Sequence, residues 1–182
     1  MTIESSNAKA GGLVGYLQYS EFKDSYAKNV TIAAPGGGGL LGQANGCEIS
    51  NVCCENGQIG IAGESDGAGG LMGAIYDSSL NYAHFVGDVF GLRRVGGLIG
   101  YVGDHSSSIA YCYADANIYS EGESPLAECV GGIVGEAGNA MILSTHFRGN
   151  IEAECDHVGG LLGRAGRVTI EDCSFSGSIQ GN

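Results

Sequence analysis

Gly96-Gly97-Leu98-Ile99-Gly100 is a glycine-rich segment that returns in nearly the same form along the whole chain. Counted from their first glycines, the six copies are 27, 31, 27, 35 and 28 residues apart. Each copy supplies three candidate turn glycines, and the full set is Gly11, Gly12, Gly15, Gly38, Gly39, Gly42, Gly69, Gly70, Gly73, Gly96, Gly97, Gly100, Gly131, Gly132, Gly135, Gly159, Gly160 and Gly163. Self-similarity at a period of this size is typical of a stacked repeat array.

The glycine content is high for a folded chain, at 34 of 182 residues. Disordered and collagen-like chains reach such a content, but this chain has only two prolines and no Gly-X-Y period. Aliphatic residues stand at fixed offsets from the glycines, which indicates positions where the backbone turns tightly or approaches another backbone. With 43% apolar residues the chain can build a core. We therefore assign residues 1–182 to a single repeat domain.

A second pattern follows each glycine segment and is clearest in the last repeat, as Ile170-x-x-Cys173-x-Phe175-x-Gly177-x-Ile179. Apolar or small residues at every second position predict β-strands. Three short strands fit each repeat: the glycine segment, the segment around Cys173 and the segment around Ile179.

Short strands separated by glycine corners can bury their apolar sides only if the chain coils and stacks each turn on the previous one. We therefore predict an all-β fold, a parallel β-helix (β-solenoid) with three short strands per turn and about six turns. The second repeat keeps the shared columns only with one extra residue, between Cys54 and Gly57. Neither end shows a capping helix or a polar terminal repeat, so we expect either a part of a longer protein or ends that a partner covers. End-to-end or side contacts between such domains are a further possibility.

Val95–Gly100 and Val158–Gly163 both read Val-Gly-Gly-Leu-x-Gly, and Cys112-Tyr113-Ala114 follows the first of them. Together with the other copies in register, these features resemble the GLUG repeat over nearly the whole chain. GLUG repeats occur in bacterial surface proteins, among them adhesin-like proteins and the non-catalytic parts of immunoglobulin A peptidases. The resemblance implies a secreted or surface-anchored stalk, extracellular or at the cell surface. We therefore predict a non-catalytic structural and binding module that presents its corner loops to a protein or glycan partner on a host or matrix surface. The resemblance implies no enzyme chemistry and no cofactor, and the peptidase metal motif His-Glu-x-x-His does not occur in this sequence.

The chain is strongly acidic, with a formal net charge of −12. Such a charge repels phosphate backbones, so direct nucleic-acid binding is not expected. No apolar run is long enough for a membrane span, and the first residues lack the charged and apolar segments of a signal peptide. If Met1 is the native start, the expected location is cytoplasmic. If the domain is a piece of a longer chain, the extracellular location implied by the resemblance stands.

One outward column of the repeats invites a metal or catalytic interpretation, and in successive turns it reads Cys53, His84, Tyr113, His146 and Ser174. The two histidines are expected roughly 10 Å apart, twice the strand spacing. One zinc ion cannot bridge that separation, so a solvated polar ladder is the favoured interpretation. Cys155-Asp156-His157 and Asp104-His105 are sequence neighbours, which point to opposite sides of a strand, and this argues against a shared metal site.

The chain has seven cysteines and no Cys-x-x-Cys pair. Cys54, Cys112 and Cys173 fall in inward columns, where we expect buried, unpaired thiols, although a disulfide between turns stays open as an alternative. In each glycine segment the residue after the two glycines, Leu98 in the fourth copy, is expected to point inward. The residue that follows it forms a further apolar column, which comprises Val14, Leu41, Met72, Ile99, Val134 and Leu162. Strict alternation would expose this column as a contact stripe. A bend at the flanking glycines would bury it, and we favour the bend.

The corner between the third strand and the next glycine segment varies most in length, and loops on a rigid scaffold are common binding sites. Acidic residues collect there, and the candidate calcium ligands are Glu121, Glu123, Glu128, Glu152, Glu154 and Asp156, with Glu64 and Asp66 at an earlier corner. Carboxylate oxygens suit calcium, but no EF-hand loop or nonapeptide repeat supports such a site. The favoured interpretation is a solvated acidic face, partly offset by Arg93 and Arg94.

Two other function classes stay open. β-Helices also occur as polysaccharide-acting enzymes, whose sites need paired carboxylates and commonly basic groups. We expect no outward cluster that mixes carboxylates with Lys or Arg, apart from the Arg93 and Arg94 corner. Alternatively, an acidic β-helix could mimic nucleic acid and occupy a DNA-binding protein, for which carboxylates would follow one face at phosphate-like intervals.

Overall fold

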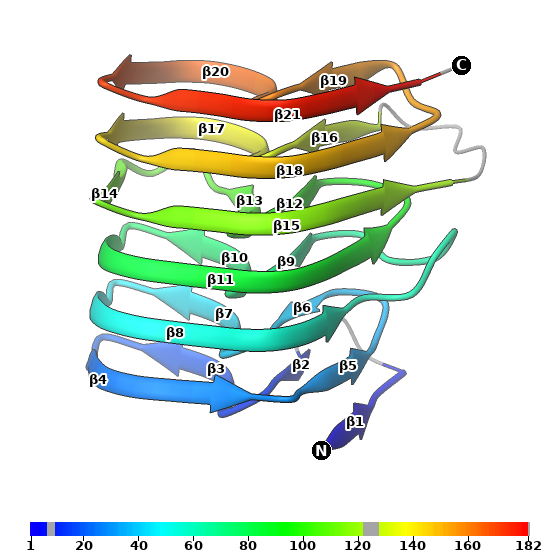
Figure 1. The fold of residues 1–182 in the computed structure, drawn as a ribbon. Coiled ribbons are helices and arrows are strands. Elements are labelled where there is room, and N and C mark those ends of the chain that lie inside the picture. The colour runs from blue at the N-terminus through cyan, green and yellow to red at the C-terminus, as the bar shows by residue number, and fades with distance from the viewer. Residues whose placement is uncertain (7–9, 122–127, 182) are drawn as a thin grey trace.

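The computed structural model describes residues 1–6, 10–121 and 128–181 of the chain. Over these residues the chain is all β and coils into a stack of parallel turns, each lying on the one before (Figure 1). The N-terminus lies at one end of the stack and the C-terminus at the other. The predicted parallel β-solenoid of about six turns is therefore confirmed.

Three kinds of strand make up the turns. A short strand begins each turn, and this set is β2 (Ala10–Gly11), β6 (Gly37–Gly38), β9 (Ala68–Gly69), β12 (Val95–Gly96), β16 (Cys129–Gly131) and β19 (His157–Gly159). The second set is β3 (Val14–Gln18), β7 (Leu41–Asn45), β10 (Met72–Tyr76), β13 (Ile99–Val102), β17 (Val134–Leu143) and β20 (Leu162–Glu171). The third set forms what we call the long-strand wall, made of β4 (Glu21–Lys28), β8 (Glu48–Ile59), β11 (Ser79–Gly91), β15 (Tyr113–Ser120), β18 (His146–Ala153) and β21 (Ser174–Gln180). Three additional strands are β1 (Thr2–Glu4), β5 (Thr31–Ala33) and β14 (Ser107–Ala110).

The strands of successive turns pair in parallel and join equivalent residues. Gly96 of β12 lies opposite Gly69 of β9 on one side and Gly131 of β16 on the other. The glycine segments are therefore superimposed, as the repeat predicts. The chain enters the stack on the last strand of a turn, because β1 pairs Ile3 with Ile32 of β5.

The extra residue of the second repeat is Asn56, which forms a bulge in β8. Val86 of β11 lies opposite Glu55 and Gly87 lies opposite Gly57, so the ladder skips Asn56. The φ angle of Asn56 is 52°, in the left-handed region that asparagine tolerates better than most residues. The columns therefore stay in register on both sides of the bulge, as the alignment of the repeats predicts.

The apolar column beside the inward leucines is buried, and the predicted bend is confirmed. Its four central members, Leu41, Met72, Ile99 and Val134, are 0% exposed, and its two terminal members, Val14 and Leu162, are partly buried. The bend follows from the backbone, where the N–H groups of Leu98 and Ile99 both donate to the carbonyl of Ile133, at 3.0 and 3.1 Å. Two consecutive N–H groups share one acceptor only where the chain turns, so both side chains enter the core.

The second glycine of each segment is required for space. A Cβ atom on Gly132 would lie 2.2 Å from the carbonyl oxygen of Gly160 in the next turn and 2.6 Å from Cγ of Phe147. Phe147 is a large core residue, 1% exposed, and its ring stacks on that of Phe175 with centroids 5.8 Å apart. Because glycine has no side chain, the Phe147 ring and the backbone of the next turn can both pack directly against Gly132.

The corners of each turn differ in position from those predicted. The pattern predicts one strand over each glycine segment, but the segment contains a sharp corner and contributes to two strands, as in β12 and β13. The residues after Cys173 and the segment around Ile179, predicted as separate strands, form the single strand β21. The reason is that inward and outward side chains alternate without a break along each strand of the long-strand wall. The chain turns sharply instead at the glycine segments, where the missing side chains let another part of the backbone come close.

Candidate functional site

The outward ladder on the long-strand wall is assembled as the sequence predicts. Its members lie opposite one another in successive strands, and Tyr26 of β4 extends the column at its start, giving Tyr26, Cys53, His84, Tyr113, His146 and Ser174. The two histidines are therefore two turns apart, with a tyrosine between them.

The ring of Tyr113 stacks on its ladder neighbour of the preceding turn. The His84 and Tyr113 rings are parallel, with centroids 4.8 Å apart and planes at 1°. In the next turn, Nδ1 of His146 lies 2.9 Å from Oγ of Ser174. Tyr113, His146, Ser174 and their neighbours line a surface hollow of about 360 Å³. One ring of a stacked pair therefore borders the hollow.

An ion pair crosses the same part of the wall. Arg148 of β18 donates a hydrogen bond to the carboxylate of Asp115, its registered partner in β15. Both side chains line the hollow beside Tyr113. The hydrogen bond and the charge of Asp115 raise the pKa of Arg148, so the guanidinium stays charged and its charge is matched locally.

A second ring pair lies at the corner that precedes this ladder. The Tyr82 and Tyr111 rings stack with centroids 5.1 Å apart, and these residues are 63% and 55% exposed. Their φ angles of 52° and 55° are left-handed. Sequence reasoning missed the pair, although Asp24 and Asn51, which tolerate that conformation, occupy the same corner in earlier turns and signal a left-handed position.

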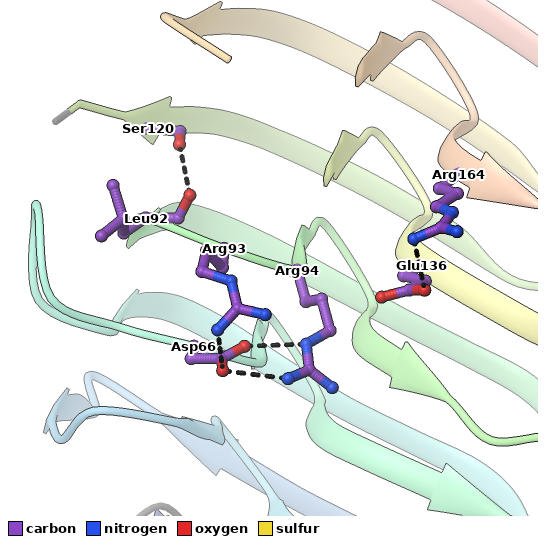
Figure 2. A network of polar contacts seen from close by, with 7 residues as sticks. All are labelled: Asp66, Leu92, Arg93, Arg94, Ser120, Glu136 and Arg164. Atoms are coloured by element: carbon purple, nitrogen blue, oxygen red, sulfur yellow. Dashed lines mark hydrogen bonds and ion pairs between the residues drawn. The ribbon is translucent and has the colours of Figure 1, made fainter. Parts of the chain in front are cut away.

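Asp66 joins two arginines of the following turn at another corner (Figure 2). Its carboxylate accepts hydrogen bonds from Nη1 of Arg93 at 2.9 Å and from Nε and Nη2 of Arg94 at 2.8 and 2.9 Å. The Arg94 guanidinium also lies over the Tyr101 ring, 5.0 Å from its centroid. Burial alone would lower the pKa of Arg94, but the hydrogen bonds and charge of Asp66 outweigh burial and raise it. The predicted offset of acidic charge by Arg93 and Arg94 is therefore confirmed as a direct ion-pair network.

Mixed clusters of acidic and basic side chains also occur away from that corner. Oε1 of Glu136 lies 3.5 Å from Nη1 of Arg164 (Figure 2). These two residues line a groove of about 450 Å³ with Asp104 and Arg167. The expectation that such clusters are confined to the Arg93 and Arg94 corner is therefore wrong. These ion pairs join residues of successive turns, and the positions of charged residues in the sequence do not show which of them lie opposite each other.

The candidate calcium ligands lie at the acidic corner. Glu121, Glu152 and Glu154 line a hollow of about 220 Å³, Asp156 is exposed and Glu128 is buried, and Glu123 falls outside the described residues. Within residues 1–6, 10–121 and 128–181, no group of three or more His, Cys, Asp or Glu side chains is placed to hold a metal ion. The same holds for the described neighbours Asp104-His105 and Cys155-Asp156-His157. The solvated acidic face stays the favoured interpretation, and calcium binding stays its alternative.

All seven cysteines lie in the described part of the chain, and no disulfide joins any two of them there. Cys54 and Cys112 are buried, and burial raises the pKa of each thiol to about 12. Cys173, in the last turn, is only partly buried. The predicted burial is therefore confirmed for the first two thiols, and the third lacks a further turn above it.

A stack of parallel turns with a glycine corner in each turn, and with outward ladders along its walls, defines a β-solenoid repeat protein. The family model of the GLUG motif matches residues 91–119, which contain β12 to β14 and all of β15 but its last residue, and residues 155–180, which contain β19 to β21. The chain therefore carries the GLUG motif in these two segments, and the resemblance drawn from the sequence is confirmed there. No curated protein and no solved structure matches the chain. In the described part of the chain, no helix has the length and apolar character needed to span a membrane.

Proposed function

We propose that this domain is a non-catalytic structural and binding module of a bacterial cell-surface or secreted adhesin-like protein. The GLUG matches support a repeat module. Each turn is hydrogen-bonded in parallel to the turns next to it, and its apolar side chains pack into one continuous core. Such a stack is expected to be a stiff rod.

The observation that carries the proposal is the side-chain composition of the long-strand wall and its adjoining corner. Four exposed tyrosines, Tyr26, Tyr82, Tyr111 and Tyr113, lie there with 71%, 63%, 55% and 46% of their surface exposed. These four side chains are exposed and are not part of the buried core. Exposed aromatic groups among polar neighbours are typical of contact surfaces. The partner in this proposal is a protein or a glycan on a host or matrix surface.

Binding of the immobilised chain to host cells, to purified matrix proteins and to a glycan array tests the proposal. The matched control replaces Tyr26, Tyr82 and Tyr111 by serine, which removes the rings and leaves the buried columns intact. Saturable binding by the native chain that the control lacks is the expected result. Absence of binding to all three panels, or turnover of a polysaccharide by the chain, would overturn the proposal, and turnover would favour the enzyme alternative.

The location is tested separately with antibodies against the chain. Labelling of intact cells that express the full gene is expected for a surface module. Labelling only after the cells are lysed would contradict it and would favour the nucleic-acid mimic, whose partner is an intracellular DNA-binding protein.

A further inference from the structure

The hollow beside Tyr113 lies on the long-strand wall, where β15, β18 and β21 run side by side (Figure 1). Its lining includes Tyr113, Asp115, His146, Arg148 and Ser174, and it measures about 360 Å³. That volume falls within the range of small-ligand sites. Successive turns contribute the lining in register, so stacked strands set the positions of these side chains.

The lining combines an aromatic wall with polar groups of both hydrogen-bonding kinds. Tyr113 supplies the ring, Asp115 supplies acceptors, Arg148 supplies donors, and the hydroxyl of Ser174 does either. A pyranose ring has one face of C–H groups, which packs on an aromatic ring, and an edge of hydroxyls, which both donate and accept hydrogen bonds. The hollow therefore offers each kind of contact that a sugar unit uses.

The ring stack indicates where such a unit would lie. His84 covers one face of the Tyr113 ring at 4.8 Å between centroids, and the ring borders the hollow beyond it. His146 is bonded to Ser174 in the next turn. Tyr113 is 46% exposed, so part of its ring is left for a ligand in the hollow to pack against.

The charges favour a neutral ligand. Arg148 is paired with Asp115, so the hollow has no unmatched cation to attract an anion. The whole chain has a net charge of −12, which repels acidic sugars and phosphates. A second platform, the exposed Tyr82 and Tyr111 pair, lies at the neighbouring corner and extends the aromatic surface beyond a single unit.

We propose that the hollow is a subsite for one hexopyranose unit of a neutral glycan, packed against Tyr113 and hydrogen-bonded by Asp115 and Arg148. This inference rests on the proposed function, because it names the ligand class of the same binding wall. A continuing sugar chain would lie over Tyr82 and Tyr111.

Saturation-transfer NMR with methyl mannoside, methyl galactoside and methyl N-acetylglucosaminide tests the subsite, with sialyllactose as the acidic arm. At least one neutral probe is expected to bind. For that probe, Tyr113→Ala is expected to weaken binding about tenfold, whereas Tyr113→Phe keeps the ring and stays within about threefold of the native chain. Asp115→Asn is expected to weaken binding as well.

Tyr16→Ala is the matched control, because Tyr16 is 44% exposed, close to the 46% of Tyr113, and lies on β3 outside the long-strand wall. It is expected to bind the probe as the native chain does. Circular dichroism melts identify any variant that fails to fold, and backbone amide shifts on titration are expected in β15, β18 and β21 but not in β3.

Three results would overturn the subsite: no neutral probe binds, sialyllactose binds better than every neutral probe, or Tyr113→Ala binds as well as Tyr16→Ala. The proposed function has a separate outcome. If the chain still binds host cells or matrix proteins while every sugar fails, the module stands and the glycan subsite does not.

Discussion

Replacing Gly132 by alanine measures how tightly the turns are stacked. Gly132 does not have a left-handed backbone conformation, so alanine is allowed there by its dihedral angles. The new methyl group would lie 2.2 Å from the carbonyl oxygen of Gly160 and 2.6 Å from Cγ of Phe147. The phenyl ring can rotate away, but the carbonyl oxygen moves only if the two turns separate. Alanine therefore acts as a wedge between them.

The expected loss of stability is about 3 kcal/mol. Overpacking of a dense core costs about 1 to 3 kcal/mol, and separating the turns weakens backbone hydrogen bonds worth about 1 kcal/mol each. One of these is donated by Gly132 N to Gly159 O at 3.2 Å. Alanine also lowers the conformational entropy of the unfolded chain, which offsets less than about 1 kcal/mol of this loss.

Thermal melting followed by circular dichroism is the assay. For a chain of this size, about 3 kcal/mol corresponds to a midpoint lower by about 6 to 12 °C. The control is Gly63→Ala, where the added Cβ is 3.5 Å from its nearest atom but φ is +70°. Only the left-handed penalty of about 1 kcal/mol applies there, so the control is expected to melt about 2 to 4 °C below the native chain.

The two variants separate spacing from backbone conformation. If Gly132→Ala melts together with Gly63→Ala, or at the native temperature, steric contact between turns does not require glycine at this position. Limited proteolysis adds a spatial check, because each turn contacts only its neighbours. Cleavage sites that appear in Gly132→Ala are expected near the altered turn, and uniform cleavage along the chain would contradict the reasoning.

Further predictions concern the charges, the thiols and calcium. Asp66→Ala leaves two partly buried arginines without their counter-ion and is expected to cost about 2 kcal/mol in urea unfolding; an unchanged midpoint would count against the network. Because burial raises the pKa values of Cys54 and Cys112 to about 12, these thiols are expected to resist iodoacetamide at mildly alkaline pH until denaturant is added, and mass spectrometry would detect early labelling. Lys28 lowers the pKa of Glu55, so the stability that Glu55 adds is present above its unfolded pKa and is lost as pH falls through its folded pKa. Glu55→Gln is therefore expected to show a smaller fall in melting midpoint from neutral to acidic pH than the native chain, and an equal fall would refute this. If the acidic corner binds calcium, the melting midpoint rises with calcium and returns with a chelator; no change rejects that site.

The turns and their register could be predicted because the repeats align with one another. Each glycine segment marks the same position in its turn, and the shift between Cys54 and Gly57 correctly locates the bulge at Asn56. The ladder through His84 and His146 follows from the same alignment. Aligning the repeats of one chain with each other therefore predicts the register between turns, which the residue pattern of a single strand does not.

Two features of the candidate site did not follow from the alternation of residues. Tyr82 and Tyr111 lie at a left-handed corner, where neither the inward nor the outward rule of a strand applies. The pair formed by Asp115 and Arg148 was open to prediction, since the two residues occupy one column, but column membership alone does not say whether long side chains meet. The stacking of Tyr82 on Tyr111 depends on the backbone geometry of the corner, and the ion pair of Asp115 with Arg148 depends on side-chain conformation.

The bulge at Asn56 has a consequence for how such a gene can change. Spacings between glycine segments run from 27 to 35 residues, yet the segments remain superimposed. Small insertions or deletions, in a strand as at Asn56 or at a corner, therefore alter one turn locally and leave the register of the adjacent turns intact. Replication slippage, which would scramble a protein whose strand order depends on distant partners, can here reshape the outer surface one layer at a time.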